Sequence, residues 1–217
     1  MMAGPTILSS PSPPSEEAGT ILLETERLII RRYFLSDAPA MAETGNDTLV
    51  SANLRAGFPS PYRLSDAEAF LSTVCKPDGT AYPQHNGIFV KPLTADNPSA
   101  EPRFIGAVGV IPKGDVYFRT WELGYWLGSA SWGKGYATEA IGAFVRWCFD
   151  TWPGLNRIEG EAYGSNEASQ KVMKKCGFVD EGTRRGAAEK LGVLMDVVNF
   201  GLLRSDLEGV KELVRDS

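Results

Sequence analysis

Two glycines, Gly133 and Gly135, stand between a strand-like segment and the start of an amphipathic helix. Glycine tolerates the backbone angles and the close approach that let successive N–H groups converge on an anion, and the N-terminus of the following helix adds partial positive charge. A phosphate or pyrophosphate group is the ligand that suits such a turn. The same residues would also suit a plain strand-to-helix turn, so the pair alone leaves both interpretations open.

Two nucleotide-binding motifs share part of this spacing, and each fails at one position. Gly128 to Lys134 has the Gly-x-x-x-x-Gly-Lys spacing of a phosphate loop, but Gly135 stands where Ser or Thr must reach a magnesium ion. A dinucleotide fingerprint needs a third glycine where this chain has Thr138, and the preceding strands do not form a βαβ series. An ATPase, a nucleotide-binding switch protein and a Rossmann enzyme are therefore disfavoured, and a pyrophosphate site of another kind remains.

The elements that must position this turn follow from the spacing of the apolar residues. Residues 137–152 carry one apolar stripe at helical spacing and end at Pro153 and Gly154. Asn166 is expected to cap a short helix that Gly177 closes, Asp37 to cap an earlier one, and a third follows Ser65. Strands are expected at 21–33, 87–91, 104–111, 116–127, 157–163, 178–185 and 193–203. This order predicts a mixed α/β sheet, with a long connection over 46–61 that is a candidate substrate loop.

The composition narrows the function classes. The 217 residues carry 22 Lys and Arg against 27 Asp and Glu, a net charge of −5, which gives no general attraction to nucleic acid or to anionic membranes. No apolar run approaches the roughly 20 residues that cross a bilayer, and the first residues do not resemble a secretory signal. Three widely spaced cysteines suit reduced thiols, so we expect a cytoplasmic protein. With His85 as the only histidine, neither a metal site nor a Ser-His-Asp triad is expected.

The two ends of the chain differ from the middle. Residues 1–20 are rich in Pro and Ser and poor in apolar residues, which predicts a disordered tail. Residues 21–208 are expected to form one domain, and residues 209–217 a C-terminal tail. The 43% hydrophobic content is enough for a buried core.

Gly133-x-Gly135-x-Ala137 followed by Thr138-Glu139-Ala140 resembles the acyl-CoA pyrophosphate motif of the GNAT N-acetyltransferases. Further segments resemble the RimJ/RimL branch of that superfamily in the same order: Thr25-Glu26-Arg27-Leu28-x-x-Arg31, Ile105-Gly106-x-x-Gly109, Glu122-Leu123-Gly124-Tyr125-Trp126-Leu127, and Asn166-x-x-Ser169-x-x-Val172 with Gly177-Phe178. One departure is Ala130, where many members carry Arg or Gln. The resemblance implies a mostly antiparallel twisted sheet of about seven strands with flanking helices. It also implies a V-shaped cleft for acetyl-CoA between strands 122–127 and 157–162.

The resemblance also implies the site residues, with acetyl-CoA as co-substrate and no metal. Glu122 resembles the acidic residue that some members use as a base, directly or through water, and burial beside Trp126 is expected to raise its pKa. The alternative is a carboxylate in solvent or in a salt bridge. Met173 occupies the position of the usual Tyr acid and has no proton to give. Ser169 resembles the serine that the RimL-like branch places near the CoA sulfur; the alternative is an N3 residue that satisfies a helix end. The implied cofactor contacts are Tyr125, Trp126, Leu127, Trp132, Gly133, Lys134, Gly135, Tyr136, Ala137, Thr138, Asn166, Ser169 and Lys175.

The predicted activity is therefore transfer of an acetyl group from acetyl-CoA to a primary amine by direct attack. The acceptor is a protein N-terminus, an amino acid or a small amine. The alternative is a non-catalytic acyl-CoA-binding module of the same fold, which the loss of the usual Tyr at Met173 supports. Several relatives form dimers, so a homodimer is compatible with the resemblance, although nothing in the sequence fixes an interface.

Overall fold

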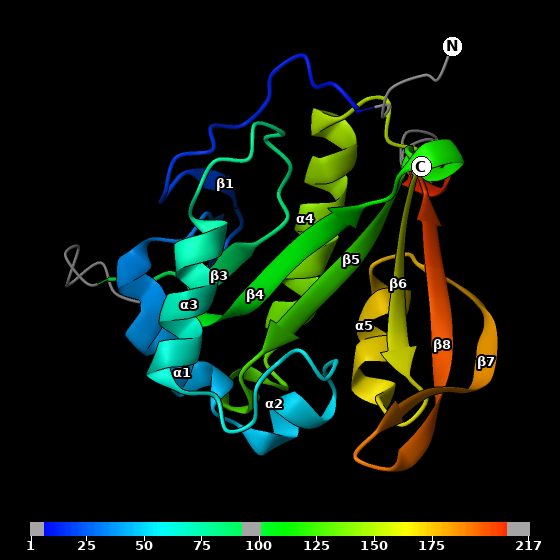
Figure 1. The fold of residues 1–217 in the computed structure, drawn as a ribbon. Coiled ribbons are helices and arrows are strands. Elements are labelled where there is room, and N and C mark those ends of the chain that lie inside the picture. The colour runs from blue at the N-terminus through cyan, green and yellow to red at the C-terminus, as the bar shows by residue number, and fades with distance from the viewer. Residues whose placement is uncertain (1–6, 93–100, 208–217) are drawn as a thin grey trace. The chain divides into compact units, whose positions relative to one another are not determined.

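The computed structural model describes residues 7–92 and 101–207, and within them the strands form one eight-stranded sheet in the order β1-β2-β3-β4-β5-β6-β8-β7 (Figure 1). The elements are β1 (Ile21–Glu24), β2 (Leu28–Arg31), α1 (Ala38–Gly45), α2 (Thr48–Ala52), α3 (Leu64–Val74), β3 (Asn86–Val90), β4 (Arg103–Pro112), β5 (Thr120–Leu127), α4 (Tyr136–Thr151), β6 (Arg157–Tyr163), α5 (Glu167–Lys175), β7 (Val179–Lys190) and β8 (Val193–Leu203). The pairing is antiparallel from β1 to β4 and among β6, β8 and β7, whereas β5 and β6 are parallel. The mixed, mostly antiparallel α/β fold is confirmed.

The chain forms two compact units. The glycine-turn unit comprises residues 14–109 and 125–143, and the cavity unit comprises residues 110–124 and 144–207 together with 7–13. Strands β4 and β5 and helix α4 each run through both units.

The first strand of the glycine-turn unit differs from the prediction. Residues 21–33 do not form one strand, because the chain reverses at Thr25 and forms the antiparallel pair of β1 and β2. Two hydrogen bonds join Thr25 and Leu28. The Thr25 amide donates to the Leu28 carbonyl at 2.9 Å, and the Leu28 amide donates to the Thr25 side-chain oxygen Oγ1 at 2.9 Å. The Thr25 side chain thus stabilises a turn that contains neither Gly nor Pro, the residues that usually mark a turn in a sequence. Because this turn divides the predicted strand in two, the sheet has eight strands instead of about seven.

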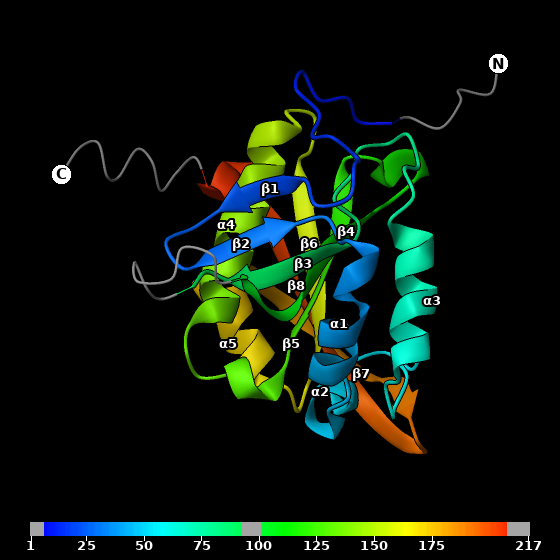
Figure 2. The same cartoon turned by 90° about the vertical axis from the view of Figure 1, so that its left-hand side faces the viewer.

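The core of the glycine-turn unit lies between β2 to β4 and helices α1 and α3, which run side by side in Figure 2. Asp37 precedes α1, but its side chain does not cap the helix as expected. Instead it accepts two hydrogen bonds of 2.8 Å from Arg31 and one of 2.8 Å from the Phe34 amide. The core cluster consists of Tyr33, Ala38, Met41, Tyr62, Ala67, Leu71, Phe89 and Phe104.

The segment over 46–61, predicted as a loop, contains the short helix α2, which Asp47 caps through a 2.8 Å bond from the Leu49 amide. Helix α3 begins at Leu64 after Arg63, one residue before the expected Ser65. Both differences concern short or weakly patterned segments.

The cavity unit is built on β8, which pairs with β6 over seven consecutive residues and with β7 on its other side. One face of these strands is buried: Ile158, Ala162, Phe200 and Leu202 are each at most 5% exposed. Trp121 and Trp152, with ring centroids 5.0 Å apart, complete this core. The opposite face carries the charged residues of the site.

The predicted tails are only partly described. Residues 1–6 and 209–217 lie outside the described residues, and the domain boundaries at 20 and 208 stay predictions. Among the described helices, none has both the length and the apolar content that a membrane span requires.

Candidate active site

The turn between β5 and α4 contains the two glycines of the predicted pyrophosphate site. Gly133 and Gly135 adopt φ values of +72° and +79°, in the left-handed region that glycine tolerates at low cost. Both glycines are exposed, and a Cβ built on Gly133 would meet no atom within 4 Å. The backbone here is accessible to a ligand, which fits the space that a pyrophosphate needs.

The turn is held by the β1–β2 hairpin through Glu139, in the first turn of α4. Glu139 accepts hydrogen bonds from Thr25 Oγ1 at 2.6 Å, from the Arg27 amide at 3.0 Å and from Arg27 Nε at 2.6 Å. Arg27 also donates to the Lys134 carbonyl at 3.0 Å, and its guanidinium lies 4.8 Å from the Tyr136 ring centroid. Partial burial alone would raise the pKa of Glu139, but these hydrogen bonds and the Arg27 charge outweigh it and lower the pKa.

The other cofactor residues predicted in this unit lie around the turn. Trp132 Nε1 donates to the Leu127 carbonyl at 2.7 Å, and Lys134 Nζ donates to the Ala130 carbonyl at 2.8 Å. Trp126 packs edge-on against Phe58 and Phe104, with centroids 5.4 and 5.9 Å away. Tyr125, Ala137 and Thr138 are half-buried. The cofactor roles of these residues stay predictions.

The charged face of the cavity unit encloses a cavity of about 380 Å³, and Glu122 lines it. The last parallel pair between β5 and β6 joins Glu122 to Glu159, whereas β6 stays paired with β8 as far as Tyr163. The two carboxylates are neighbours on one face, because directly opposite residues of paired strands point the same way. The lining residues are Lys113, Glu122, Arg157, Glu159, Gly160, Glu161, Glu181, Arg184, Asn199 and Phe200.

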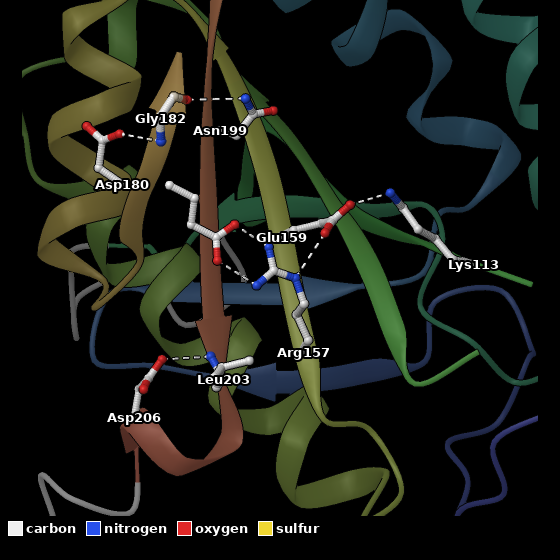
Figure 3. A network of polar contacts seen from close by, with 9 residues as sticks. Lys113, Arg157, Glu159, Asp180, Gly182, Asn199, Leu203 and Asp206 are labelled. Carbon is white, nitrogen blue, oxygen red and sulfur yellow. Dashed lines mark hydrogen bonds and ion pairs between the residues drawn. The ribbon is translucent and has the colours of Figure 1, made fainter. Parts of the chain in front are cut away.

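Ion pairs connect most of the charged side chains of this cavity, and Figure 3 shows Lys113 and Arg157 on either side of Glu159. Arg157 binds Glu181 in a bidentate manner, with Nη1 to Oε1 at 2.7 Å, and donates from Nε to Glu159 at 3.0 Å. Lys113 also binds Glu159, and Arg184 binds Glu161. Burial alone would raise the pKa of Glu159, but Lys113 and Arg157 lower it overall. The hydrogen bonds from Arg157 lower the pKa of Glu181.

Gly201 makes room for this network. It lies opposite Glu159 on one side of β8 and opposite Val179 on the other. A Cβ at Gly201 would fall within 3.0 Å of both the Glu181 carboxylate and the Arg157 guanidinium. The Arg157–Glu181 pair therefore crosses β8 above a position that has no side chain.

Helix α5 bears out the predicted cap. Asn166 Oδ1 accepts a 3.1 Å hydrogen bond from the Ser169 amide, so Ser169 takes the N3 position of the structural alternative. Met173 is 2% exposed, and a Cβ at Gly160 of β6 would lie 2.6 Å from its methyl carbon, so Met173 is a core residue packed on β6. Ser169 does not line the cavity that Glu122 lines, and Lys175 is exposed in the last turn.

Five charged residues of the cavity were not among the predicted site residues: Lys113, Arg157, Glu159, Glu181 and Arg184. A signal was present in part, because Arg157, Glu159 and Glu161 alternate along β6 and therefore share one face. Nothing in the sequence indicated that Lys113, 46 residues away, would reach Glu159. His85 is an exposed residue of the loop that precedes β3. Within residues 7–92 and 101–207, no group of three or more His, Cys, Asp or Glu is arranged to hold a metal ion.

Residues 27–179 match the family model described as the acetyltransferase (GNAT) domain. The uncharacterized N-acetyltransferase p20 of Bacillus licheniformis is 29% identical over 188 residues, which cover 86% of this chain and 98% of that protein. The structure of RimL, a ribosomal alpha-N-protein acetyltransferase in complex with coenzyme A, matches with a TM-score of 0.68 at 17% identity over 84% of this chain and 97% of that one. A ribosomal-protein alanine acetyltransferase from Vibrio fischeri matches with a TM-score of 0.68 at 22% identity over 85% and 97%.

Proposed function

This chain belongs to the GNAT acetyltransferase family and is thus an acetyl-CoA-dependent acetyltransferase. We propose that its acceptor is a primary amine, which enters the cavity of the cavity unit as an ammonium ion. Glu122 is the proposed base. Acetyl-CoA supplies the activated acetyl group, and the residues of the chain bind the amine, remove its proton and hold the co-substrate.

The charge of the cavity carries this proposal. Its lining contains three cations, Lys113, Arg157 and Arg184, against four carboxylates, so one negative charge is left over. The ion pairs described above join all three cations to Glu159, Glu161 and Glu181. The lining as a whole, which includes Glu122, therefore has a net charge of −1. A half-enclosed cavity with net negative charge attracts cations and concentrates them locally.

The two opposed carboxylates have environments that suit different roles. Lys113 and Arg157 keep Glu159 ionised, which makes it a weak base and a fixed negative charge beside the incoming ammonium group. Glu122 is half-buried on the neighbouring strand. We assign proton removal to Glu122 and electrostatic binding of the ammonium group to Glu159.

The acceptor classes differ in how they suit this charge. A free amino acid brings a carboxylate close to its amine, and that carboxylate would meet the negative lining. A protein N-terminus or a small amine has no such group, and the two ribosomal-protein acetyltransferases that share the fold act, by their names, on protein substrates. We therefore favour a peptide N-terminus or a small amine as acceptor.

The co-substrate contacts follow the positions of the predicted residues in each unit. In the glycine-turn unit, the amides over 133–136 and the start of α4 are proposed to bind the pyrophosphate. In the cavity unit, Asn166 is proposed to contact the pantetheine arm and Lys175 the adenosine phosphate. The Ser169 hydroxyl is a proposed hydrogen-bond donor to the departing sulfur.

A coenzyme A release assay over a panel of amines tests the proposal. The panel contains a peptide with a free N-terminus, its N-formylated form, an alkyl diamine and free amino acids. We expect release with the peptide or the diamine, and a decrease in kcat of about 10²-fold or more for Glu122→Gln. Glu189→Gln, which neutralises an exposed glutamate that does not line the cavity, should keep full activity.

Binding of the co-substrate is measured separately by calorimetry with acetyl-CoA and with ATP. Gly135→Asp should abolish acetyl-CoA binding, because it places a carboxylate in the glycine turn. Gly192→Asp is the matched control, since Gly192 has a similar φ of +78° and open surroundings in the β7–β8 turn. Acetyl-CoA binding without coenzyme A release for any amine would instead identify a non-catalytic acyl-CoA-binding module.

A further inference from the structure

The carboxylate of Glu16, in the segment predicted as a tail, is bound by the backbone of a distant loop. Glu16 Oε2 accepts hydrogen bonds from the amides of Asp78 at 2.7 Å and Gly79 at 3.0 Å, and Oε1 accepts one from the Ala81 amide at 3.0 Å. All four residues belong to the glycine-turn unit. Three convergent backbone donors on one carboxylate form an anion-binding nest.

The loop that forms the nest has its amides aimed at side-chain oxygens throughout. Between the three amides that bind Glu16, the Thr80 amide donates to Asp78 Oδ1 at 2.9 Å, and the following Tyr82 amide donates to Thr80 Oγ1 at 3.2 Å. Gly79 and Ala81 adopt φ values of +77° and +58°, and the second is unfavourable for a residue with a Cβ. The carboxylate of Glu16 therefore satisfies donors in a backbone that is costly to form.

Arg32 supplies a cation to the same place. Its guanidinium donates to the Ser15 carbonyl at 2.7 Å and to the Ala81 carbonyl at 3.0 Å, and so links the segment that carries Glu16 to the loop that binds it. Burial lowers the pKa of Arg32, while the charges of Glu16 and Asp78 act in the opposite direction. Arg32 thus balances one of two nearby carboxylates.

We propose that the amides of Asp78, Gly79 and Ala81, together with Arg32, form an oxyanion-binding site for which Glu16 is the tethered ligand, and that a free carboxylate or phosphate binds there when Glu16 is absent. Without Glu16, the charges of Asp78 and Arg32 cancel, so the partial positive charge of the three amides determines which ions bind. A carboxylate fits best, because the site already holds one through both of its oxygens. The Glu16 side chain thus occupies a site that a free carboxylate can fill once Glu16 is removed.

The test uses the full chain with Glu16→Ala and, as matched control, Glu17→Ala, which removes the adjacent exposed glutamate. Thermal unfolding is followed in sodium acetate, sodium phosphate and sodium chloride at equal ionic strength. We expect Glu16→Ala to lower Tm by roughly 4 °C and acetate to restore it with saturation, while the control and the wild type do not respond. Restoration by phosphate but not acetate would leave the site an oxyanion site but overturn the preference for carboxylate.

A second measurement locates the bound anion. In ¹⁵N-labelled Glu16→Ala protein, acetate should shift the amide resonances of Asp78, Gly79 and Ala81 along a saturable curve, and the wild type should show no such shift. Glu16→Gln, which keeps the shape of the side chain, replaces Glu16→Ala if the latter does not fold. An unchanged Tm in the variant, equal responses to acetate in all three proteins, or shifts spread over other residues would each contradict the proposal.

Discussion

Glu122 of β5 and Glu159 of β6 are directly opposite each other in the last parallel pair of these strands, and both line the same cavity. The structure separates them by environment, since Lys113 and Arg157 both bind Glu159. This difference supports the proposed division of roles, with Glu159 as the fixed anion and Glu122 as the proton acceptor.

The ion pairs of the cavity predict a loss of stability in acid. The pKa values of Glu159 and Glu181 are lower in the folded state than the ordinary value of 4.5. Their contribution to stability is therefore complete above pH 4.5 and is lost as the pH falls through the lower folded values. We expect Glu159→Gln to destabilise the protein by about 1 kcal/mol at pH 7, after allowance for solvent screening, and by much less at pH 3.

Urea unfolding of the wild type and Glu159→Gln at pH 7, 5, 4 and 3 measures this convergence. Glu189→Gln, at an exposed position outside the cavity, serves as the control and should follow the wild type at every pH. A difference that stays constant down to pH 3 would show that the charge of Glu159 does not contribute.

The contacts of Glu139 predict a link between the first hairpin and co-substrate binding. Glu139→Ala removes the acceptor for Thr25 and for two groups of Arg27, and should cost about 1 to 2 kcal/mol of stability, since Arg27 is 41% exposed and partly screened. Glu139→Gln keeps an oxygen for the two neutral donors and should cost less. Acetyl-CoA affinity, measured by calorimetry, should fall in the same order, and equal affinities for both variants and the wild type would refute the link.

The elements that were predicted best have a regular spacing of apolar residues, or are followed by Pro and Gly residues that end them. Strand β6 was predicted with its observed bounds, and α4 within one residue at each end, where Pro153 and Gly154 follow an apolar stripe. The Thr25 turn was missed because it contains no Gly or Pro, and because the Thr25 side chain also binds Glu139, which is 114 residues away in the sequence. The cap at Asp37 was wrong because Arg31 and the Phe34 amide compete for the same carboxylate.

In the candidate site too, the features formed by residues close together in the sequence were predicted, and those formed by distant residues were not. The glycine turn and the Asn166 cap are local features, and their backbone geometry agrees with expectation. The cavity is not local, because the fold brings Lys113, Arg157 of β6, and Glu181 and Arg184 of β7 together from three segments of the chain. Side-chain packing could not be predicted either. Glu122 was expected to be buried beside Trp126; in the structure the Trp126 ring packs against Phe58 and Phe104, and Glu122 is half-buried.

Burial of Cys148 and Cys75 predicts that their thiols react slowly with thiol reagents in the native protein. Cys148 is fully buried, and burial raises its pKa well above 9; burial also raises the pKa of the half-buried Cys75, whose Sγ lies 3.5 Å from the Tyr33 carbonyl oxygen. Because the thiolate is the reactive form, Cys148 should react with Ellman's reagent only as the protein unfolds. Its labelling rate should become independent of reagent concentration at high reagent. A Cys75→Ser, Cys176→Ser variant isolates its signal, and fast labelling of the folded variant would contradict the buried position.

Two crowded glycines, Gly109 and Gly201, are expected to respond very differently to substitution. A Cβ at Gly109 of β4 would collide with the Gln84 carbonyl, which is backbone and cannot move away without displacing the start of β3. A Cβ at Gly201 would meet only the ends of Glu181 and Arg157, which can rotate. We therefore expect Gly109→Ala to cost about 3 kcal/mol or more and Gly201→Ala about 1 kcal/mol or less, measured by urea unfolding. In a Glu181→Ala background the Gly201→Ala cost should shrink further, because the displaced ion pair is already gone. A large cost that persists in that background would mean that Gly201 serves the backbone of β8 and not the Arg157–Glu181 pair.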